Sequence, residues 1–590
     1  MKKIFILVFL SVNLFCVKSY AQDILWKHQG AFEKKELQHL LNRTMFGAAF
    51  KDIKHFEGKT MDQVVDELLD VPTSFSEEPI WHAKTNDYPN LIVGEKWINT
   101  PNSTAWTIST LQINVELWHH GLILEQKPNI REKMVLFYEN FLPSNQGKNQ
   151  AADGLYYYNR VKLNHEYAVG NYKELIKKLT FEPLMMIYLD LNQSFAYDWR
   201  HFYSPNAYPK KPQSMNENYA RELQELYTLG KGRYNDQKLF TEDDVKATAA
   251  VLSGWFVCNN KDGAILKACC KDSLTYKTTY TPGLHADTDK KFSDFYNSKI
   301  IKYKVGQAGG KQEADEMFDM IFDRPEVAEN LARKLYRFFV YSYIDDCTEK
   351  EVIQPLAKIL RDNNYELKPA LKALLSSSHF YSKDARGIMI KNPFDFFGGI
   401  LRMMGAKSIP LSTLISGNLR TYQVTYNNFK SYTRSAGMGL SIAPDVAGYA
   451  AYFETPDYHH HWINAESMRN RRRTVFNPNE YTGILTMSQE IDNFTAKNDP
   501  LIIFCANQFN FTAASDTKTF VQDNIDYFFA QDLSQAEKDK LVTILEDNSL
   551  SWKVAWLSYK GGNKSYYNHV YSKLLRFYDA LFSYAEFQLM

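Results

Sequence analysis

The sequence predicts an all-α fold: a multi-helix, elaborated domain with long loops and at most a few short strands. Apolar residues recur with the spacing of amphipathic helices over much of the chain. Alternating apolar and polar residues, the pattern of half-buried strands, are scarce and short. The helical pattern is clearest at Phe32, Leu37, Leu40 and Leu41, at Met61, Val64, Val65, Leu68 and Leu69, and at Ala328, Leu331, Leu335, Phe338 and Phe339.

The first residues have the features of a signal peptide. Lys2 and Lys3 precede an apolar run at 4–15, and Ser19-Tyr20-Ala21 offers small residues where a signal peptidase cleaves. The run is too short for a membrane anchor, which needs about 20 apolar residues. Lipid attachment at Cys16 is disfavoured because a bulky residue, Phe15, precedes it. We expect residues 1–21 to be removed and the chain to be exported to the periplasm, the medium or the outer surface, with no transmembrane segment left.

The length predicts more than one ordinary core, because hydrophobic cores stop growing at about 250–300 residues and this chain has 590. We expect a main helical domain at 22–480 and a C-terminal helical section at 481–590 packed on it. Asn477-Pro478-Asn479 lies near this boundary. The long loops are expected where Pro, Gly and Asn cluster, at 100–103, 143–147 and 192–214.

Composition excludes several classes of protein. Hydrophobic residues make up 45% and charged residues 23%, which excludes a mainly disordered, collagen-like or multi-pass membrane chain. The net charge is +1, and removal of residues 1–21 takes away three lysines and no acid, so the mature chain is slightly acidic. A chain with this balance has no basic field for nucleic acid. Aromatic residues reach 15%, but much of that share sits at helical core spacing, so it supports a sugar-binding cleft only weakly.

Five cysteines follow the signal peptide, an odd number that leaves at least one without an intramolecular partner. Cys258 with Cys269 or Cys270 brackets a polar loop, and a local disulfide there is plausible in an exported protein. Zinc binding is disfavoured because no second Cys-x-x-Cys pair is present. The remaining cysteines are Cys347 and Cys505.

The segment from Met215 to Gly230 is the richest in information. On a helix, Tyr219, Leu223 and Leu226 would share a core face, and Gly230 would end the last turn. Asn216 is a suitable N-cap. A second stripe contains Asn218, Glu222 and Glu225, with Glu222 at the edge of the core face, where burial would raise its pKa. Glu217 and Arg221 are four residues apart and can pair; a solvated, salt-bridged face is the alternative for all these charges.

The same segment resembles the signature of a bacterial family named domain of unknown function 1800, which looks like Asn-Glu-Asn-x-Ala-Arg-Glu-Leu-x-Glu-Leu-x-Thr-Leu-Gly. Further blocks resemble the family in order along nearly the whole mature chain, and they lie at 39–47, 240–255, 285–292, 334–340, 391–393, 443–449 and 462–464. One block departs from the family. Many relatives have Phe-Trp-His-Asn-His-Phe where this chain has Glu139 and Phe141 in place of the two histidines, which puts any metal-dependent activity in doubt.

Most candidate site residues fall within the blocks that resemble the family. We expect Glu222 and Glu225, or His285 oriented by Asp287, to perform acid–base catalysis. The expected binding residues are His39, Arg43, His165, Asn216, Asn218, Arg221, Trp255, Trp462 and Arg471. The polar residues expected to converge on one cleft are His39, Arg43, His165, Asn218, Arg221, Glu222, His285 and Asp287. For each histidine the alternative is a buried, hydrogen-bonded side chain. Arg471 is expected to clamp an internal carboxylate or an anionic ligand. The adjacent histidines His119-His120 and His459-His460-His461 are expected in surface loops.

Two functions fit these residues. The first is an exported enzyme that acts on an extracellular or envelope polymer such as a polysaccharide. The second is a non-catalytic envelope binding or scaffold protein in which the signature block is a polar network between helices. The family resemblance implies a partner, since relatives tend to be encoded beside sulfatase-like or phosphatase-like exported proteins of the domain of unknown function 1501 family. Nucleophile-elbow, zinc-protease, phosphate-loop and dinucleotide motifs are absent from the sequence, and no metal site is predicted; the sequence leaves the cofactor open.

Overall fold

The computed structural model describes residues 25–82, 91–99, 108–145, 154–203, 205–234, 236–257, 278–405, 419–475, 513–547 and 550–590. Within these ranges the protein is mainly helical, as predicted, with two short two-stranded sheets. The expected signal peptide, Cys258, Cys269, Cys270 and Cys505 lie outside the described residues, and Cys347 is half-buried. In the described part of the chain, no helix is both long enough and apolar enough to cross a membrane.

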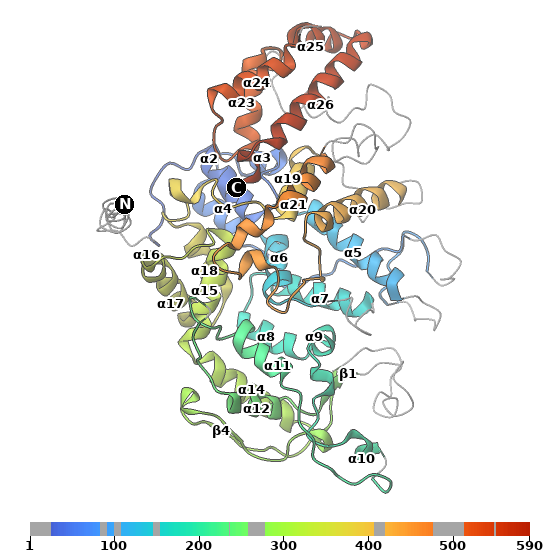
Figure 1. Cartoon of the computed structure of the whole chain (residues 1–590), viewed down its shortest axis with the longest axis vertical. Helices are drawn as coiled ribbons and strands as arrows, with labels where there is room; N and C mark the ends of the chain where they lie inside the picture. The colour runs from blue at the N-terminus through green and yellow to red at the C-terminus, as the bar shows by residue number, and fades with distance from the viewer. Residues whose placement is uncertain are drawn as a thin grey trace.

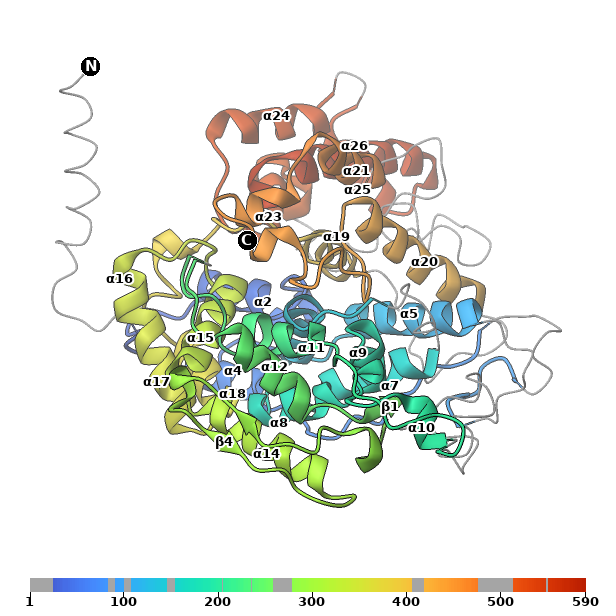
Figure 2. The ribbon, with the colours of Figure 1, turned by 60° about the horizontal axis from the view of Figure 1, so that its bottom comes forward.

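The centre of the molecule is formed by two helices that are buried on nearly every side, α5 (Ile108–Leu124) and α6 (Arg131–Phe141). A helix covered all round has no amphipathic stripe. Both pack on α7 (Gly154–Glu166), and α5 also packs on α20 (Leu419–Ser435) (Figure 2). Around them lie α2 (Lys34–Thr44), α3 (Phe50–Phe56), α4 (Met61–Leu68), α8 (Tyr172–Thr180), α9 (Pro183–Tyr188) and α19 (Pro393–Met403) (Figure 1).

One end of the molecule holds the signature segment and the two sheets (Figure 1). Strand β1 (Trp255–Val257) pairs antiparallel with β2 (Thr278–Tyr280), and β3 (Lys290–Lys291) with β4 (Ile300–Ile301). The helices of this end and its flank are α10 (Trp199–Tyr203), α11 (Asn218–Glu222), α12 (Glu242–Val251), α14 (Gly309–Phe322), α15 (Pro325–Phe339), α16 (Asp346–Thr348), α17 (Gln354–Asp362) and α18 (Leu367–Leu375).

The predicted core positions of α4 and α15 are buried. The residues Met61, Val64, Val65 and Leu68 all face the core, and Thr60 begins α4 with a capping box to Gln63. On α15, the apolar stripe packs against α17. The periodicity is therefore a reliable guide where one face of the helix meets solvent.

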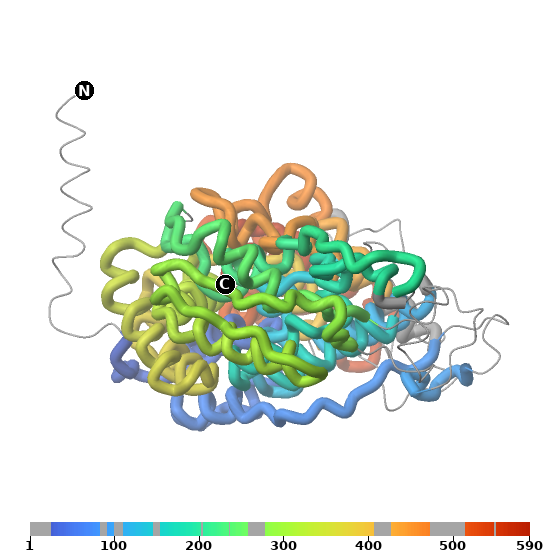
Figure 3. Tube along the Cα trace, turned by 90° about the horizontal axis from the view of Figure 1, so that it is seen from below, coloured from blue at the N-terminus to red at the C-terminus, as the bar shows by residue number. Residues whose placement is uncertain are grey.

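The opposite end of the molecule is formed by α23 (Thr517–Phe528), α24 (Gln535–Leu545), α25 (Trp552–Lys560) and α26 (Tyr567–Ser583). Figure 3 looks along the long axis from the sheet end. In this view the C-terminus is marked near the middle of the molecule. The last residues return to the main body, where the short helix Glu586–Gln588 (η14) follows α26 and Leu589 bridges Ile390. α21 (Ala465–Val475) also packs on α26.

Candidate functional site

The signature helix changes its geometry within the segment at 215–230. α11 runs directly into a π-helical turn, Leu223–Tyr227 (η2), and Gly230 follows with φ +74°. Single π-helical turns widen a helix and are frequent at functional sites. Two side chains of α15 bind the carbonyl groups at its end: Asn330 donates to Thr228 O at 2.8 Å and Lys334 donates to Leu226 O.

The beginning of the signature helix differs from the prediction. The helix begins at Asn218, and Glu217 occupies the N-cap position without a side-chain hydrogen bond. Asn216 instead accepts a hydrogen bond from the Asn218 N–H at 2.9 Å, because an Asn side chain readily closes a turn onto the backbone two residues later. Asn216 therefore shapes the turn before the helix, and Asn218 is half-buried.

The side chain of Arg221 links two helices. Its guanidinium group donates to both carboxylate oxygens of Glu242, at 2.9 and 2.7 Å, and lies 3.5 Å from Glu217. Glu242 begins α12, so this fork-like pair joins α11 to α12. The predicted pairing of Glu217 with Arg221 is confirmed.

Glu222 is the signature residue whose environment fits acid–base chemistry. Burial raises the pKa of its carboxyl to about 7, and the negative charges of Glu225 and Asp445 add to the shift. Lys231 forms an ion pair with Glu225 at 2.5 Å, whereas Glu222 has no hydrogen-bond or ion-pair partner among the described residues. A carboxyl group with a pKa near neutrality can donate or accept a proton at pH 7. The predicted direction of this shift is confirmed.

Tyr188 lies close enough to Glu222 to sense its charge. Burial, Asp445 and Glu222 together raise the pKa of the Tyr188 hydroxyl to about 12. Tyr188 ends α9, and Asp445 belongs to the segment before η8 (Ala450–Tyr452). Three separate parts of the chain thus meet at Glu222. Asp445 was inside a block that resembles the family, but nothing in its local sequence indicated that it lies near Glu222.

His285 and Asp287 do not form the predicted pair. The carboxylate bonded to His285 is that of Glu313 on α14, with Nε2 to Oε2 at 3.1 Å, and Nδ1 faces the Ser253 carbonyl at 2.9 Å. Asp287 turns away and accepts from Tyr197 and from Lys210, the latter at 3.1 Å. Both ring nitrogens of His285 face other acceptors, the Ser253 carbonyl and the Glu313 carboxylate, which leaves neither for Asp287.

The surroundings of His285 are those of a buried structural network. Glu313 is fully buried and also accepts from Lys290 at 2.5 Å. Ser253 approaches His285, but its hydroxyl donates to Ala250 O at 2.8 Å rather than to the imidazole. The group has the residue types of a nucleophilic triad, but the Ser253 hydroxyl is buried.

His39 and Arg43 lie on one face of α2, as predicted, but they do not share an anion. His39 Nε2 is 2.9 Å from Phe380 O, and burial together with the Arg43 charge lowers the pKa of this imidazole well below its usual value. Arg43 donates to Val340 O at 3.1 Å and to Ala385 O at 2.7 Å. Both side chains therefore tie α2 to neighbouring backbone.

His165 is also buried among protein partners. Its Nε2 atom is 3.0 Å from Glu132 of α6, its Nδ1 atom is 2.7 Å from Val161 O, and its ring stacks on Phe75 at 4.2 Å. This interaction joins α7 to α6.

Trp255, Trp462 and Arg471, the remaining predicted binding residues, each lie among protein partners of their own. Trp255 packs on Phe181, with ring centroids 4.3 Å apart. Trp462, in the short helix Tyr458–Trp462 (η9), lies 5.8 Å from Tyr452. Arg471 donates to Gln588 Oε1 at 3.0 Å and to Lys391 O at 2.8 Å, so it clamps neutral acceptors instead of the expected carboxylate or ligand.

Glu139, which replaces a histidine of the relatives, holds a loop. It is buried and accepts from the backbone N–H and the hydroxyl of Ser441 at 2.8 and 2.9 Å, and burial raises the pKa of its carboxyl. Phe141 packs with Phe137, their ring centroids 4.6 Å apart. Across the described ranges, no three His, Cys, Asp or Glu side chains are grouped to hold a metal ion.

The adjacent histidines were wrongly expected in surface loops. His119 and His120 are buried in α5, where both neighbouring positions face protein. His459 is buried in η9, whereas His460 is exposed. Adjacent histidines therefore do not by themselves indicate a surface loop, because a helix that is covered on nearly every side can bury both of them.

Comparison with known protein families agrees with the resemblance found in the sequence. The model of a family described as protein of unknown function (DUF1800) matches residues 39–589. The chain belongs to this family. No curated protein and no solved structure matches the chain. The DUF1800 signature thus contains the π-helical turn and Glu222.

Proposed function

We propose that this DUF1800 protein is an exported enzyme that cleaves an extracellular or envelope polymer, with Glu222 as the group that transfers the proton. The observation that supports the proposal is the raised pKa of Glu222, about 7, in a carboxylate without a pairing partner among the described residues. Perturbed carboxyl groups of this kind are concentrated at catalytic sites. Burial is the main cause of the raised pKa, and the negative charges of Glu225 and Asp445 add to it, while Lys231 and Arg221 offset part of the shift.

A polysaccharide is the proposed polymer. The segment around α10 projects from the sheet end of the molecule and exposes Trp199 and Tyr208, which are 39% and 41% accessible (Figure 1). Arg200 and Lys210 lie over the rings of Tyr208 and Tyr197. Aromatic faces beside cationic groups suit sugar rings that carry acidic substituents.

The test is polymer cleavage by purified protein. Wild type is incubated with peptidoglycan and with neutral and acidic polysaccharides, and soluble fragments are measured between pH 5 and 9. We expect fragment release with an apparent pKa near 7 and at least a 100-fold loss in Glu222→Gln, because removing an acid–base group costs about 10²–10⁴ in rate. Glu217→Gln, at a half-buried position of the signature segment next to Arg221, is the matched control and keeps wild-type activity.

A non-catalytic scaffold is the second candidate, favoured by the burial of His39, Arg43, His165 and Arg471 and by their hydrogen bonds to other parts of the protein. Such a protein would work with a sulfatase-like or phosphatase-like exported partner of the domain of unknown function 1501 family. Absence of fragments from every polymer, or equal cleavage by wild type and Glu222→Gln, would reject the proposed enzyme and leave this candidate.

A further inference from the structure

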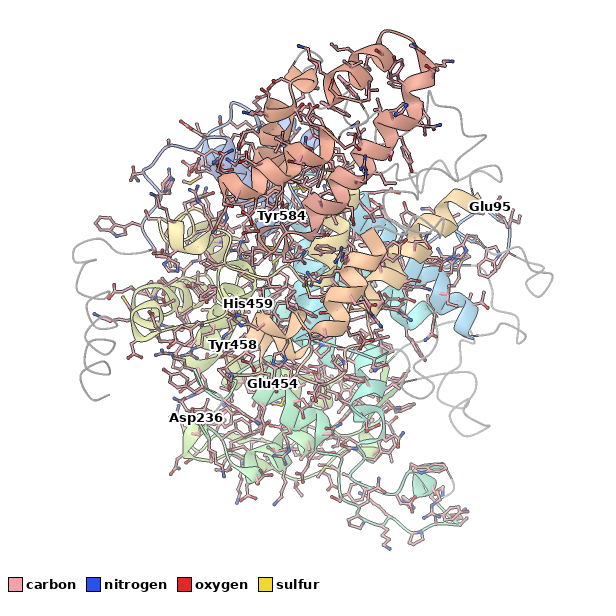
Figure 4. The ribbon with its side chains drawn as sticks, turned by 45° about the horizontal axis from the view of Figure 1, so that its top comes forward. Glu95, Asp236, Glu454, Tyr458, His459 and Tyr584 are labelled. Atoms are coloured by element: carbon pink, nitrogen blue, oxygen red, sulfur yellow. The ribbon has the colours of Figure 1, made fainter. Side chains whose placement is uncertain are left out.

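The helices α25 and α26 pack together and form one extremity of the molecule (Figure 1). Tyr584 follows the last turn of α26 and lies beside the main body, so the connection between the two helices is at the other, outer end of α26 (Figure 4). This connection is exposed at 561–565 and again at 568–569. We call residues 553–569 the tip, and it faces solvent over most of its length.

The tip is basic. From 548 to 578 the sequence has no aspartate or glutamate, and its lysines and arginine are Lys553, Lys560, Lys564, Lys573 and Arg576. Lys573 and Arg576 pair with Asp547. Lys553 and Lys564, in contrast, are exposed and have no ion-pair partner among the described residues. The tip therefore carries a local positive field that no acidic residue of its own offsets.

Two carboxylates near the start of α25 are used as helix caps. Asp516 begins α23 and accepts from the Thr519 N–H at 2.9 Å. Glu546 accepts from the Trp552 N–H, at the first position of α25, at 3.2 Å. Within the described ranges, neither carboxylate forms an ion pair with Lys553, so this lysine stays available to an outside partner.

The outward face of α25 combines lysines with apolar side chains. At 100° per residue, one side of the helix carries Lys553, Val554, Leu557 and Lys560, and both tryptophans of the helix point into the core. Val554 and Leu557 are 46% and 39% accessible. Apolar residues beside lysines on one helix face are typical of helices that lie in the plane of a membrane surface, where the long lysine side chains reach the headgroups.

Half-buried tyrosines accompany this face. They lie within the tip or directly after it, and they are Tyr559, Tyr566, Tyr567 and Tyr571. The rings of Tyr567 and Tyr571 are stacked, with centroids 5.7 Å apart. A tyrosine has an apolar ring and a polar hydroxyl, so it suits the boundary between water and lipid, where tyrosines are enriched.

An anionic membrane surface matches both parts of the tip. Acidic headgroups would meet the lysines, and Val554 and Leu557 would enter the boundary beneath the headgroups. A soluble acidic chain would use the charges alone, and an apolar protein surface would desolvate the lysines without pairing them. Because the tip projects at one extremity of the molecule, a flat surface can reach it.

We propose that the tip docks the protein peripherally on a membrane whose surface carries anionic phospholipid headgroups. The whole chain has a net charge of only +1 and is slightly acidic without residues 1–21, so the attraction belongs to the tip rather than to the molecule as a whole. The docking is independent of the chemistry proposed at Glu222.

Co-sedimentation with lipid vesicles tests the docking. The mature chain, residues 22–590, is used because the apolar run at 4–15 would itself bind lipid. The vesicles contain phosphatidylcholine alone or with about 30% phosphatidylglycerol. We expect at least tenfold stronger binding to the anionic vesicles, and weaker binding as sodium chloride rises from about 50 to 500 mM, because salt screens the lysines.

Three results of this experiment would overturn the proposal. The first is no binding to either kind of vesicle, and the second is equal binding to both. The third is retention of the protein on an immobilised acidic polysaccharide without any binding to vesicles, which would make a polymer the partner.

A double lysine variant locates the binding surface. Lys553→Gln with Lys564→Gln should weaken binding to anionic vesicles at least tenfold, because each lysine at such a surface strengthens binding about fivefold. Lys291→Gln with Lys299→Gln removes the same net charge from exposed positions at the sheet end and keeps wild-type binding. An equal loss in the two double variants would show that net charge and not the tip determines binding.

A second double variant tests the apolar contact. Val554→Ser with Leu557→Ser keeps every charge, and we expect at least fivefold weaker binding, because the removed apolar area no longer leaves water on docking. Both positions are exposed, so the thermal unfolding midpoint should stay within about 2 °C of wild type. Unchanged binding would mean that charge alone holds the protein and would reject docking into the membrane boundary.

Hydrogen exchange of the unsubstituted mature chain maps the contact without any variant. With anionic vesicles present, we expect slower exchange of the backbone amides at 561–565, because this connection is exposed in the free protein and covered on the membrane. The segment around α10, which also exposes aromatic side chains, should keep its exchange rate. Slower exchange at α10 with no change at 561–565 would overturn the proposal.

Discussion

Glu222 illustrates what a single position reveals in a sequence. Its place at the edge of a helical apolar face predicts burial and a raised pKa, and both are found, because neighbours within one helix are fixed by its period. The contribution of Asp445 was not predictable, since that residue is more than 200 positions away and no local pattern places it. The same limit applies to Glu313 as the partner of His285.

Glu222→Gln should change how stability depends on pH. The folded pKa, about 7, lies above the ordinary value of 4.5, so the folded protein binds the proton more tightly and loses stability as pH rises from 4.5 to 7. Gln cannot titrate. We expect the variant to match wild type near pH 5 and to exceed it by about 1 kcal/mol at pH 8, a full linkage effect discounted for solvent screening.

Urea unfolding at pH 5 and pH 8 measures the effect, and Glu217→Gln serves as the control with a change below about 0.5 kcal/mol at both values. The same pH slope in wild type and Glu222→Gln would show that the carboxyl titrates normally.

Helices differ in how clearly the hydrophobic pattern of their sequence predicts them. α4 and α15 have one apolar face and were predicted correctly. α5 and α6 are covered on nearly every side, so the adjacent polar residues His119 and His120 wrongly indicated a loop. The π-helical turn could not be predicted, because Asn330 and Lys334 of α15 bind its end.

Glu313→Gln tests whether the His285 network is structural. The substitution leaves Lys290 buried without a carboxylate, and breaking a buried ion pair costs about 3–5 kcal/mol. We expect a fall of this size in the free energy of unfolding, measured with guanidinium chloride. Glu316→Gln, on the same helix but paired with Lys304 in partly exposed surroundings, should cost under about 1 kcal/mol. Equal effects in the two variants would contradict a buried lock.

The division of the chain at 480 remains a prediction, but contacts across it are extensive. Gln38 on α2 donates to Asp526 O at 3.0 Å, and Lys391 lies 3.8 Å from the ring centroid of Phe587. Such contacts join residues hundreds of positions apart, so hydrophobic periodicity could indicate the helices of both sections and not the interface between them.

Phe587 offers a test of how the two ends of the molecule are coupled. Its ring is buried among Phe396 of the main body and Phe582 of α26, with centroids 5.6 and 4.7 Å away. Phe587→Ala should lower the free energy of unfolding by about 3–5 kcal/mol, because a buried aromatic ring is removed and a cavity remains. Leu557→Ala, on an exposed position of α25, is the control and should change stability little.

If the C-terminal helices unfold together with the main body, tryptophan fluorescence, to which Trp552 and Trp556 contribute, and far-ultraviolet circular dichroism will report one coincident transition in both variants. The backbone amides of α6 and α26 are then protected from hydrogen exchange to the same degree, since both helices open only by global unfolding. Two separate transitions in wild type, or loss of protection in α26 alone after Phe587→Ala, would instead mean that the C-terminal section is an independent folding unit held to the body by its last residues.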